Sequence, residues 1–425
     1  MKIFLDTIGC RLNQAEIESL ALQFRAAGHE IVPSATDADL SVINTCTVTA
    51  KAASDSRAAI RRTKRLGTGS IVVTGCWATL EPEKAIALPG VTCVVPNLQK
   101  NRLAAVVLGS PQDFFNLEHL ARQPLPGLHQ RTRAFIKAQD GCDNTCTFCI
   151  TTVARGASRS RPVEDVLLDV QGALNGWTKE IVLTGVQLGA WGHDLTTRLC
   201  LSDLVSELLA LSSVPRLRMS SLEPWDLEVD FLRLWADPHL CRHLHLPLQS
   251  GSASVLKRMA RKTTPDDFAR LVASARSIIP EVAITTDLIT GFPGETDTEF
   301  AETMEFIKAM GFSGGHVFPY SARPGTPAAR MQGQVRSELA KKRGAALRSI
   351  LAESAKDYRR KFIGRTMPVL WEARSTLTDS GWQIEGLTDN FIRVVAFASK
   401  PKANCLDNVQ LLKEGPEYLL GEILE

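Results

Sequence analysis

The sequence predicts an α/β protein in three parts: an N-terminal open parallel sheet, a central partial barrel of six βα units, and a small C-terminal β-barrel. Three observations predict this fold class. Apolar strand-like runs alternate with helix-period segments through residues 2–320, and a proline-rich stretch interrupts that order at residues 108–133. From residue 361 onward the pattern changes to short β-rich runs between Gly, Asp and Asn turns.

The N-terminal part carries strand patterns at residues 2–6, 39–44 and 70–74, with helical patterns at 13–27 and 52–66 between them. Each strand ends in a turn that contains a cysteine, and these N-terminal cysteines are Cys10, Cys46 and Cys76. Because the turns after parallel strands share one edge of a sheet, we expect the three thiols to lie close together. We place this domain at residues 1–107 and a linker at 108–132.

The central part carries six strand patterns, at residues 134–138, 180–183, 217–220, 243–248, 283–290 and 315–320. Helical patterns lie between them, at residues 163–174, 201–211, 265–277 and 298–310. No seventh or eighth unit follows, which predicts a partial parallel barrel with its active face at the carboxyl ends of the strands. A long helix at 336–361 ends this domain, which we place at residues 133–360. Strand patterns at 366–371, 381–385, 391–396 and 417–423 predict a small β-barrel at residues 361–425.

Composition excludes several classes of protein. The 425 residues are 44% hydrophobic, which is enough for real cores, and ten cysteines are too sparse for a disulfide scaffold. The N-terminus shows no signal-peptide pattern, so we expect a cytoplasmic protein. No run approaches the roughly 18 apolar residues of a membrane-spanning helix. The net charge of +3 neither demands nor excludes a nucleic-acid partner.

Three cysteines are crowded in a C-x3-C-x2-C run directly after the first barrel strand, and this cysteine triplet is Cys142, Cys146 and Cys149. A zinc site usually needs a fourth ligand, and no second close pair follows, although His193 or Cys200 could be recruited. Three thiolates suit a [4Fe–4S] cluster whose fourth iron stays open for a substrate or cofactor. Zinc binding remains the alternative interpretation of the spacing alone.

Around this triplet the chain resembles the radical S-adenosylmethionine superfamily, and within it the methylthiotransferase branch. The motifs that carry the resemblance cover nearly the whole chain, at residues 9–14, 44–46, 75–76, 141–149, 220–224, 245–251 and 291–296. The resemblance implies two [4Fe–4S] clusters. The first cluster, bound by the triplet, would cleave S-adenosylmethionine to a radical. The second, auxiliary cluster, bound by the N-terminal cysteines, would hold a sulfur that is methylated and then replaces the hydrogen of a C–H bond.

The resemblance also implies contacts to S-adenosylmethionine from the ends of successive barrel strands. The expected residues are Phe148, Gly185, Gln187, Ser221, Glu223, Gln249, Gly291 and Phe318. An ordinary tight turn is the alternative interpretation of each of these loops. No catalytic residue beyond the cluster ligands is expected. The C-terminal segment resembles the family's TRAM domain, an OB-like barrel that binds RNA, and the family implies tRNA and a flavodoxin- or ferredoxin-type electron donor as partners of a monomeric enzyme.

Three substrates occur in this branch: isopentenyl-modified tRNA adenosine, threonylcarbamoyl-modified tRNA adenosine, and an aspartate of a ribosomal protein. Residues 9–16, 137–142 and 316–326 most resemble the threonylcarbamoyladenosine type, which acts on C2 of the adenosine at tRNA position 37. One departure is Thr-Thr-Val at 151–153, where family members commonly carry Ile-Pro-Tyr. The alternative from another class is a non-catalytic tRNA-binding metalloprotein.

Basic residues form three groups that could contact phosphate or could be solvated faces. Residues 336–365 hold ten Lys and Arg against three acids, whereas residues 361–425 carry a charge of −2. The other two groups are Arg57, Arg61 and Arg65, and Arg155, Arg159 and Arg161. We expect packing roles for Cys93, Cys200, Cys241 and Cys405. For His243 and His245 we expect core or hydrogen-bonding roles, with catalysis as the alternative.

Overall fold

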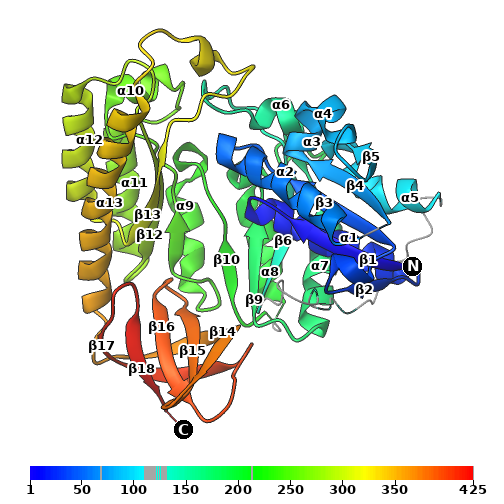
Figure 1. The fold of residues 1–425 in the computed structure, drawn as a ribbon. Helices are drawn as coiled ribbons and strands as arrows, with labels where there is room; N and C mark the ends of the chain where they lie inside the picture. Colours follow the sequence, from blue (N-terminus) through cyan, green and yellow to red (C-terminus); the bar gives the residue numbers. More distant parts are fainter. Residues whose placement is uncertain are drawn as a thin grey trace.

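The computed structural model describes residues 1–67, 69–109, 121, 123, 125, 132–211 and 214–424. Its chain forms three parts in the predicted order (Figure 1). The N-terminal domain, blue to cyan, lies beside the central green and yellow domain, and the C-terminal barrel, orange to red, lies at the lower end of the central domain. The predicted linker at residues 108–132 falls largely outside the described residues.

The N-terminal domain is a parallel sheet of five strands in the order β2-β1-β3-β4-β5. The strands are β1 (Lys2–Thr7), β2 (Glu30–Val32), β3 (Leu40–Thr45), β4 (Ser70–Gly75) and β5 (Val91–Val95). Its helices are α1 (Arg11–Ala26), α2 (Ala50–Arg65), α3 (Cys76–Leu80), α4 (Pro82–Ile86) and α5 (Leu103–Leu108), with 3-10 turns η1 (Ala35–Asp37) and η2 (Asn97–Arg102). Every residue of β3 is buried, because helices cover both faces of a parallel sheet.

The central domain is a half barrel of six parallel strands. One sheet has the order β6-β9-β10 and the other β11-β12-β13, and a bridge between Ser221 and His245 joins them. The strands are β6 (Arg133–Lys137), β9 (Glu180–Thr184), β10 (Leu217–Met219), β11 (His243–His245), β12 (Ala283–Thr290) and β13 (Gly314–Pro319). The prediction of six strands with intervening helices is confirmed.

The longer helices cover the outside of this half barrel (Figure 1). The helices are α6 (Thr151–Arg155), α7 (Val163–Asn175), α8 (Leu201–Ala210), α9 (Val229–Leu232), α10 (Ala253–Arg258), α11 (Pro265–Ile278), α12 (Asp297–Met310) and α13 (Ser337–Arg360). The short elements are β7 (Gln139–Asp140), β8 (Arg159–Ser160), η5 (Leu188–Ala190), η6 (Pro224–Asp226), η7 (Arg233–Ala236) and η8 (Pro327–Arg330). Among the described residues, no helix is both long and apolar enough to cross a bilayer.

The N-terminal domain packs against the half barrel through α1, which contacts β6 and β9. Ala15 of α1 shares a small buried cluster with Phe135 of β6 and Val182 of β9. Glu16, one residue further along α1, forms ion pairs with Lys137 and Arg155 of the central domain. Apolar contact and buried charge therefore both fix the N-terminal domain against this edge of the half barrel.

The C-terminal domain is a closed barrel in the order β14-β15-β16-β18-β17. Its strands are β14 (Thr366–Thr378), β15 (Gly381–Thr388), β16 (Arg393–Ala398), β17 (Leu406–Glu414) and β18 (Leu419–Ile423). The barrel packs against the half barrel where β11 begins. Phe391 stacks on His243 with ring centroids 4.2 Å apart, and Arg242 donates to Asp389 at 2.6 Å. Closure removes exposed strand edges, as a small barrel requires.

Candidate active site

The N-terminal cysteines lie together at the carboxyl edge of the N-terminal sheet. Cys10 follows β1 and precedes α1, Cys46 follows β3, and Cys76 begins α3 directly after β4. A Cβ placed on Gly9 would lie 2.7 Å from the Cys46 Sγ, so the turn that carries Cys10 contacts the thiol of Cys46. The structure thus brings these thiols to one wall of a common cavity, as the strand order predicts.

Gly75 sets the position of Cys76. Its φ of +96° is a left-handed conformation, and a Cβ there would lie 2.2 Å from the Thr45 carbonyl oxygen. A side chain at this position would push β3 and β4 apart and would displace the Cys76 thiol. That thiol accepts a hydrogen bond from the Asn97 side-chain amide at 3.6 Å.

A buried ionic network lies directly behind the N-terminal cysteines. Glu16 accepts from Arg155 at 2.8 Å and from Lys100 at 2.6 Å, and all three side chains are 2–3% exposed. Arg155 also donates to Asn13 at 2.7 Å and to Asp140 at 2.8 Å. Burial alone would raise the pKa of Glu16, but Arg155, Lys100 and Lys137 hold that pKa well below its ordinary value.

This network corrects one prediction. We expected Arg155 to form a surface group with Arg159 and Arg161, yet Arg155 is buried in ion pairs because α6 packs against the N-terminal domain. Arg161 also has a partner, Asp169, at 2.7 Å.

The cysteine triplet occupies the loop between β7 and α6. Gly141, directly before it, has a φ of +71°, and a Cβ there would lie 1.8 Å from the Ala157 carbonyl oxygen. The thiols accept backbone N–H groups: Asn144 donates to the Cys142 Sγ and Thr151 to the Cys149 Sγ, each at 3.4 Å. Such donors stabilise thiolates and tune iron–sulfur clusters.

Both sets of thiols face a buried arginine. Burial raises the pKa of the Cys46 thiol to about 11, and Arg155 opposes that rise. Burial likewise raises the pKa of Cys146, and Arg261 opposes it from 3.9 Å. Since a thiol must lose its proton to bind metal, these cations favour the ligating form. Two sets of three thiols, each beside a fixed cation, fit two clusters.

Gln139, which sequence reasoning missed, holds the triplet loop to the next strand end. Its Oε1 accepts from the backbone N–H groups of Val186 and Gln187 at 2.9 Å, and its Nε2 donates to the Gly141 carbonyl at 2.8 Å. Gln187 in turn lies 3.3 Å from the Cys142 Sγ. A polar residue at a fully buried strand position is the signal that could have identified Gln139.

The other predicted cofactor contacts lie around the same face. Phe148 packs into the apolar cluster that contains Phe292, directly after Gly291. Gln249 has a φ of +76°, a strained conformation for a residue with a side chain and one that is frequent at functional sites. Glu223 is bound by Arg261 at 2.7 Å. These cofactor contacts stay predictions.

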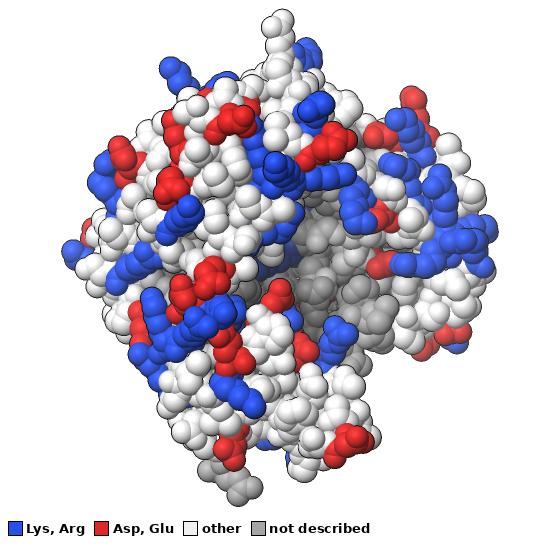
Figure 2. Space-filling model, turned by 60° about the vertical axis from the view of Figure 1, so that its left-hand side comes forward, with Lys and Arg blue, Asp and Glu red and all other residues white. Residues whose placement is uncertain are grey.

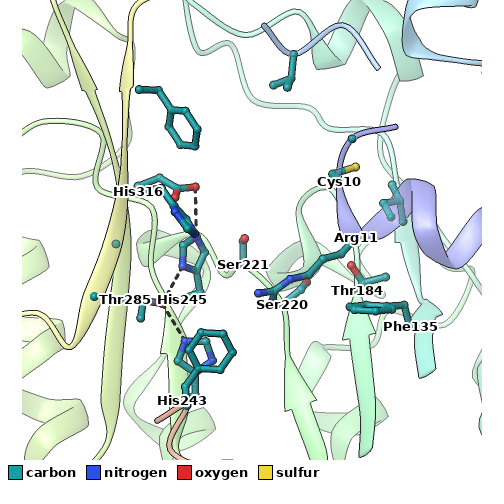
Figure 3. Close-up of a pocket in the computed structure, with 18 of the residues that line it drawn as sticks. Cys10, Arg11, Phe135, Thr184, Ser220, Ser221, His243, His245, Thr285 and His316 are labelled. Carbon is teal, nitrogen blue, oxygen red and sulfur yellow. Dashed lines mark hydrogen bonds and ion pairs between the residues drawn. The ribbon is translucent and has the colours of Figure 1, made fainter. Parts of the chain in front are cut away.

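A cavity of about 1210 Å³ joins all three domains. At one end lie the N-terminal cysteines and Ile150 and Thr151, which follow the triplet. The middle is lined by strand ends that carry polar side chains, and Figure 3 shows Arg11 extending from beside Cys10 toward Ser220 and Ser221. Figure 2 shows the corresponding hollow between the domains, with Lys and Arg along part of its rim. Ser221 and Phe318 both line this cavity.

The histidines in the cavity wall form a fixed network. His243 and His245 each lie within 2.9 Å of the Thr285 hydroxyl, and His245 lies 3.2 Å from Asp287. Burial holds the pKa of His243 well below its ordinary value, so its ring is neutral. The expected core and hydrogen-bonding role of His243 is confirmed.

The remaining cysteines divide into two pairs. Cys241 is buried and Cys93 half-buried, which agrees with packing. The packing prediction is wrong for Cys200 and Cys405, which are exposed.

The sequence is similar to two known protein families and to several named proteins. Residues 2–96 match the uncharacterized protein family UPF0004, and residues 136–307 match the radical SAM superfamily. The chain is 37% identical to a Bacillus subtilis protein named threonylcarbamoyladenosine tRNA methylthiotransferase MtaB, across 99% of this chain and 96% of that one. It is 32% identical to a Cereibacter sphaeroides tRNA-2-methylthio-N6-dimethylallyladenosine synthase, across 100% and 98%.

Among solved structures, the fold is similar to that of the radical S-adenosylmethionine methyltransferase TsrM from Kitasatospora setae. The TM-score is 0.55 at 14% identity, and the match covers 77% of each chain. At that identity the likeness concerns the fold alone.

Proposed function

The chain belongs to the tRNA methylthiotransferase family of radical S-adenosylmethionine enzymes, and we propose that it replaces the C2 hydrogen of N6-threonylcarbamoyladenosine at tRNA position 37 with a methylthio group. The observation that carries this proposal is a cavity of about 1210 Å³ whose wall includes both the N-terminal cysteines and residues next to the triplet. A radical site and a sulfur site must both reach the same base, and one shared cavity permits this.

The enzyme uses S-adenosylmethionine and [4Fe–4S] clusters, as its family does. We assign one cluster to the triplet and an auxiliary cluster to the N-terminal cysteines, on the donor chemistry described above. When bound, the first supplies the electron that cleaves S-adenosylmethionine, and the second holds the sulfur that is transferred. Backbone N–H groups donate to the Cys142 and Cys149 sulfurs, and Arg155 and Arg261 oppose the rise that burial causes in the pKa of Cys46 and of Cys146.

The chain's own side chains position the reactants. Gln139 fixes the strand end of Gly185 and Gln187 against the triplet loop, and Phe148 with Phe292 forms an apolar wall beside it. An adenine inside a folded anticodon loop must be extruded to reach such a cavity. The cavity has room for an extruded base together with the cofactor.

We further propose that the C-terminal barrel is an RNA-binding TRAM domain and that the enzyme is a cytoplasmic monomer supplied by a flavodoxin- or ferredoxin-type donor. The barrel lies at the end of the cavity opposite the N-terminal cysteines, where Asn390, Phe391 and Arg393 line it. The adjoining α13 contributes Arg348 and Arg359 to the same wall. These basic and aromatic groups support the proposal, because such groups bind the backbone and the bases of single-stranded RNA.

Nucleoside analysis of tRNA tests the function. A strain lacking the gene should accumulate N6-threonylcarbamoyladenosine and lose its 2-methylthio derivative, and wild-type protein should restore that derivative. A variant with all three N-terminal cysteines replaced by Ala should not restore it. Persistence of the 2-methylthio derivative, with no second gene supplying it, would contradict the proposal. Loss of 2-methylthio-isopentenyladenosine instead would identify the sister substrate.

A further inference from the structure

Arg11 stands at the centre of the cavity. It is the first residue of α1 and directly follows Cys10, which lines the same wall. Figure 3 shows its side chain leaving α1 and extending past Thr184 toward Ser220 and Ser221 at the strand ends of the half barrel. A guanidinium in this position lies between the proposed sulfur site and the barrel interior.

Every other arginine that lines the cavity forms an ion pair or a hydrogen bond, whereas Arg11 forms neither with the described residues. The others have partners: Arg133 binds Glu372, Arg155 binds Glu16, Arg348 donates to the Val317 carbonyl, Arg359 lies 3.8 Å from Glu414, and Arg393 lies 3.5 Å from Glu385. A partly enclosed cation without a counter-ion is costly to a folded protein, so its retention points to an anionic ligand.

The acids whose charge reaches Arg11 are engaged elsewhere. These are Asp287 and Glu180. Glu180 is fully buried and binds Arg218 at 2.7 Å, while Asp287 lies 3.2 Å from His245. Neither forms an ion pair with Arg11 in the described structure. The guanidinium is therefore free to make the bidentate contact that arginine forms with a carboxylate.

We propose that Arg11 binds the carboxylate of the threonylcarbamoyl substituent and thereby selects this substrate. The inference rests on the proposed function and specifies how the site reads its base. In adenine, C2 and C6 are both bonded to N1, and C6 bears the N6 substituent. A base that directs its C2 toward the proposed sulfur site therefore directs its N6 substituent along the same wall of the cavity. Arg11, next to Cys10, lies on that wall. An isopentenyl substituent has no anionic group for Arg11 to bind.

Paired ligands test this contact. The two ligands are anticodon stem-loops that carry either N6-threonylcarbamoyladenosine or its carboxamide at position 37. The carboxamide keeps the shape but removes the charge and replaces one acceptor oxygen by an NH2 group. Fluorescence anisotropy with full-length, cluster-loaded protein gives the ratio of the two affinities. Charge-assisted hydrogen bonds predict that wild type prefers the acid by roughly 10- to 100-fold and that Arg11→Gln loses most of that preference. Arg11→Lys should keep part of it, because it keeps the charge but not the fork.

Arg393→Gln is the matched control, because it removes one positive charge from the cavity wall at a position that has its own acidic partner. It should weaken both stem-loops equally and leave the acid preference intact. Iron content and S-adenosylmethionine affinity of Arg11→Gln are measured in parallel. A drop in S-adenosylmethionine affinity would assign Arg11 to the cofactor's carboxylate and overturn the inference.

Two further outcomes overturn it while the proposed function stands: equal binding of acid and carboxamide by wild type, or an acid preference that Arg11→Gln retains. Failure of the proposed function itself can be distinguished from these outcomes by a second assay. In a turnover assay with the same stem-loops, wild type would then add no methylthio group to the threonylcarbamoyl ligand, and the inference would fall with it.

Discussion

Replacing Glu16 by Gln should loosen the N-terminal domain behind the proposed auxiliary site. Glu16 is the anion shared by Lys100 at 2.6 Å and Arg155 at 2.8 Å, and all three side chains are almost fully buried. The amide keeps the shape but removes the charge, and it leaves Lys100 with neutral amide oxygens, such as that of Asn44 at 3.2 Å, in place of an anion. Stranding a buried charge costs about 3–5 kcal/mol.

Hydrogen–deuterium exchange of the amides in α1 and β3 measures this cost locally, which suits a multidomain chain. At about 1.4 kcal/mol per factor of ten, the opening equilibrium of these amides should rise roughly 140- to 3,700-fold in Glu16→Gln. Asp55→Asn on α2 is the control, since its partner Lys51 is exposed and no buried cation is stranded. Indistinguishable exchange in the two variants would refute the reasoning.

The pH dependence has a definite sign. The pKa of Glu16 is held well below its ordinary value of 4.5, so its contribution is fully present above about pH 4.5 and is lost as the pH falls through the folded-state pKa. The stability difference between wild type and Glu16→Gln should therefore stay constant from neutral pH to about 4.5 and shrink below it. A difference that grew on acidification would have the wrong sign.

Further predictions concern iron and cofactor cleavage. Gly141→Ala should lose about half of the iron, because the added Cβ would lie 1.8 Å from the Ala157 carbonyl oxygen. Gly28→Ala is the control and should keep all of its iron. Gly28 has a similar positive φ, but a Cβ added there would have no atom within 4 Å. Full iron in Gly141→Ala would contradict the assignment of the triplet loop. Replacing all three N-terminal cysteines by Ala should also halve the iron while cleavage of S-adenosylmethionine to 5′-deoxyadenosine persists; unchanged iron would exclude an auxiliary cluster there. Replacing the triplet by Ala should abolish the cleavage, and product formation by that variant would place the radical site elsewhere.

Local patterns predicted the parts of the fold that depend on local chemistry. The six barrel strands, α13 and the turns with Gly-Cys pairs follow from periodicity and from the special conformation of glycine. Strand β2 has only three residues, too few for a pattern, and the polar residues of β17 hid its alternation. Both strands became visible only in the sheets that they complete.

The site shows the same division. The cysteine triplet could be recognised because its spacing is local, and the N-terminal cysteines because each one directly follows a strand pattern. The network of Glu16, Lys100 and Arg155 could not, because its members lie 84 and 139 residues apart and each one resembles an ordinary surface charge in the sequence. The isolation of Arg11 was equally hidden, because it depends on where every neighbouring acid finds its partner.

Turnover by the purified protein tests the central claim most directly. The protein is loaded with iron and sulfide under anaerobic conditions and supplied with S-adenosylmethionine, a low-potential reductant and anticodon stem-loops carrying either threonylcarbamoyl- or isopentenyl-adenosine at position 37. Mass spectrometry of the nucleosides should show one SCH3 in place of the C2 hydrogen of the threonylcarbamoyl substrate and no change in the isopentenyl one. Conversion of the isopentenyl substrate alone, or of neither, would contradict the account.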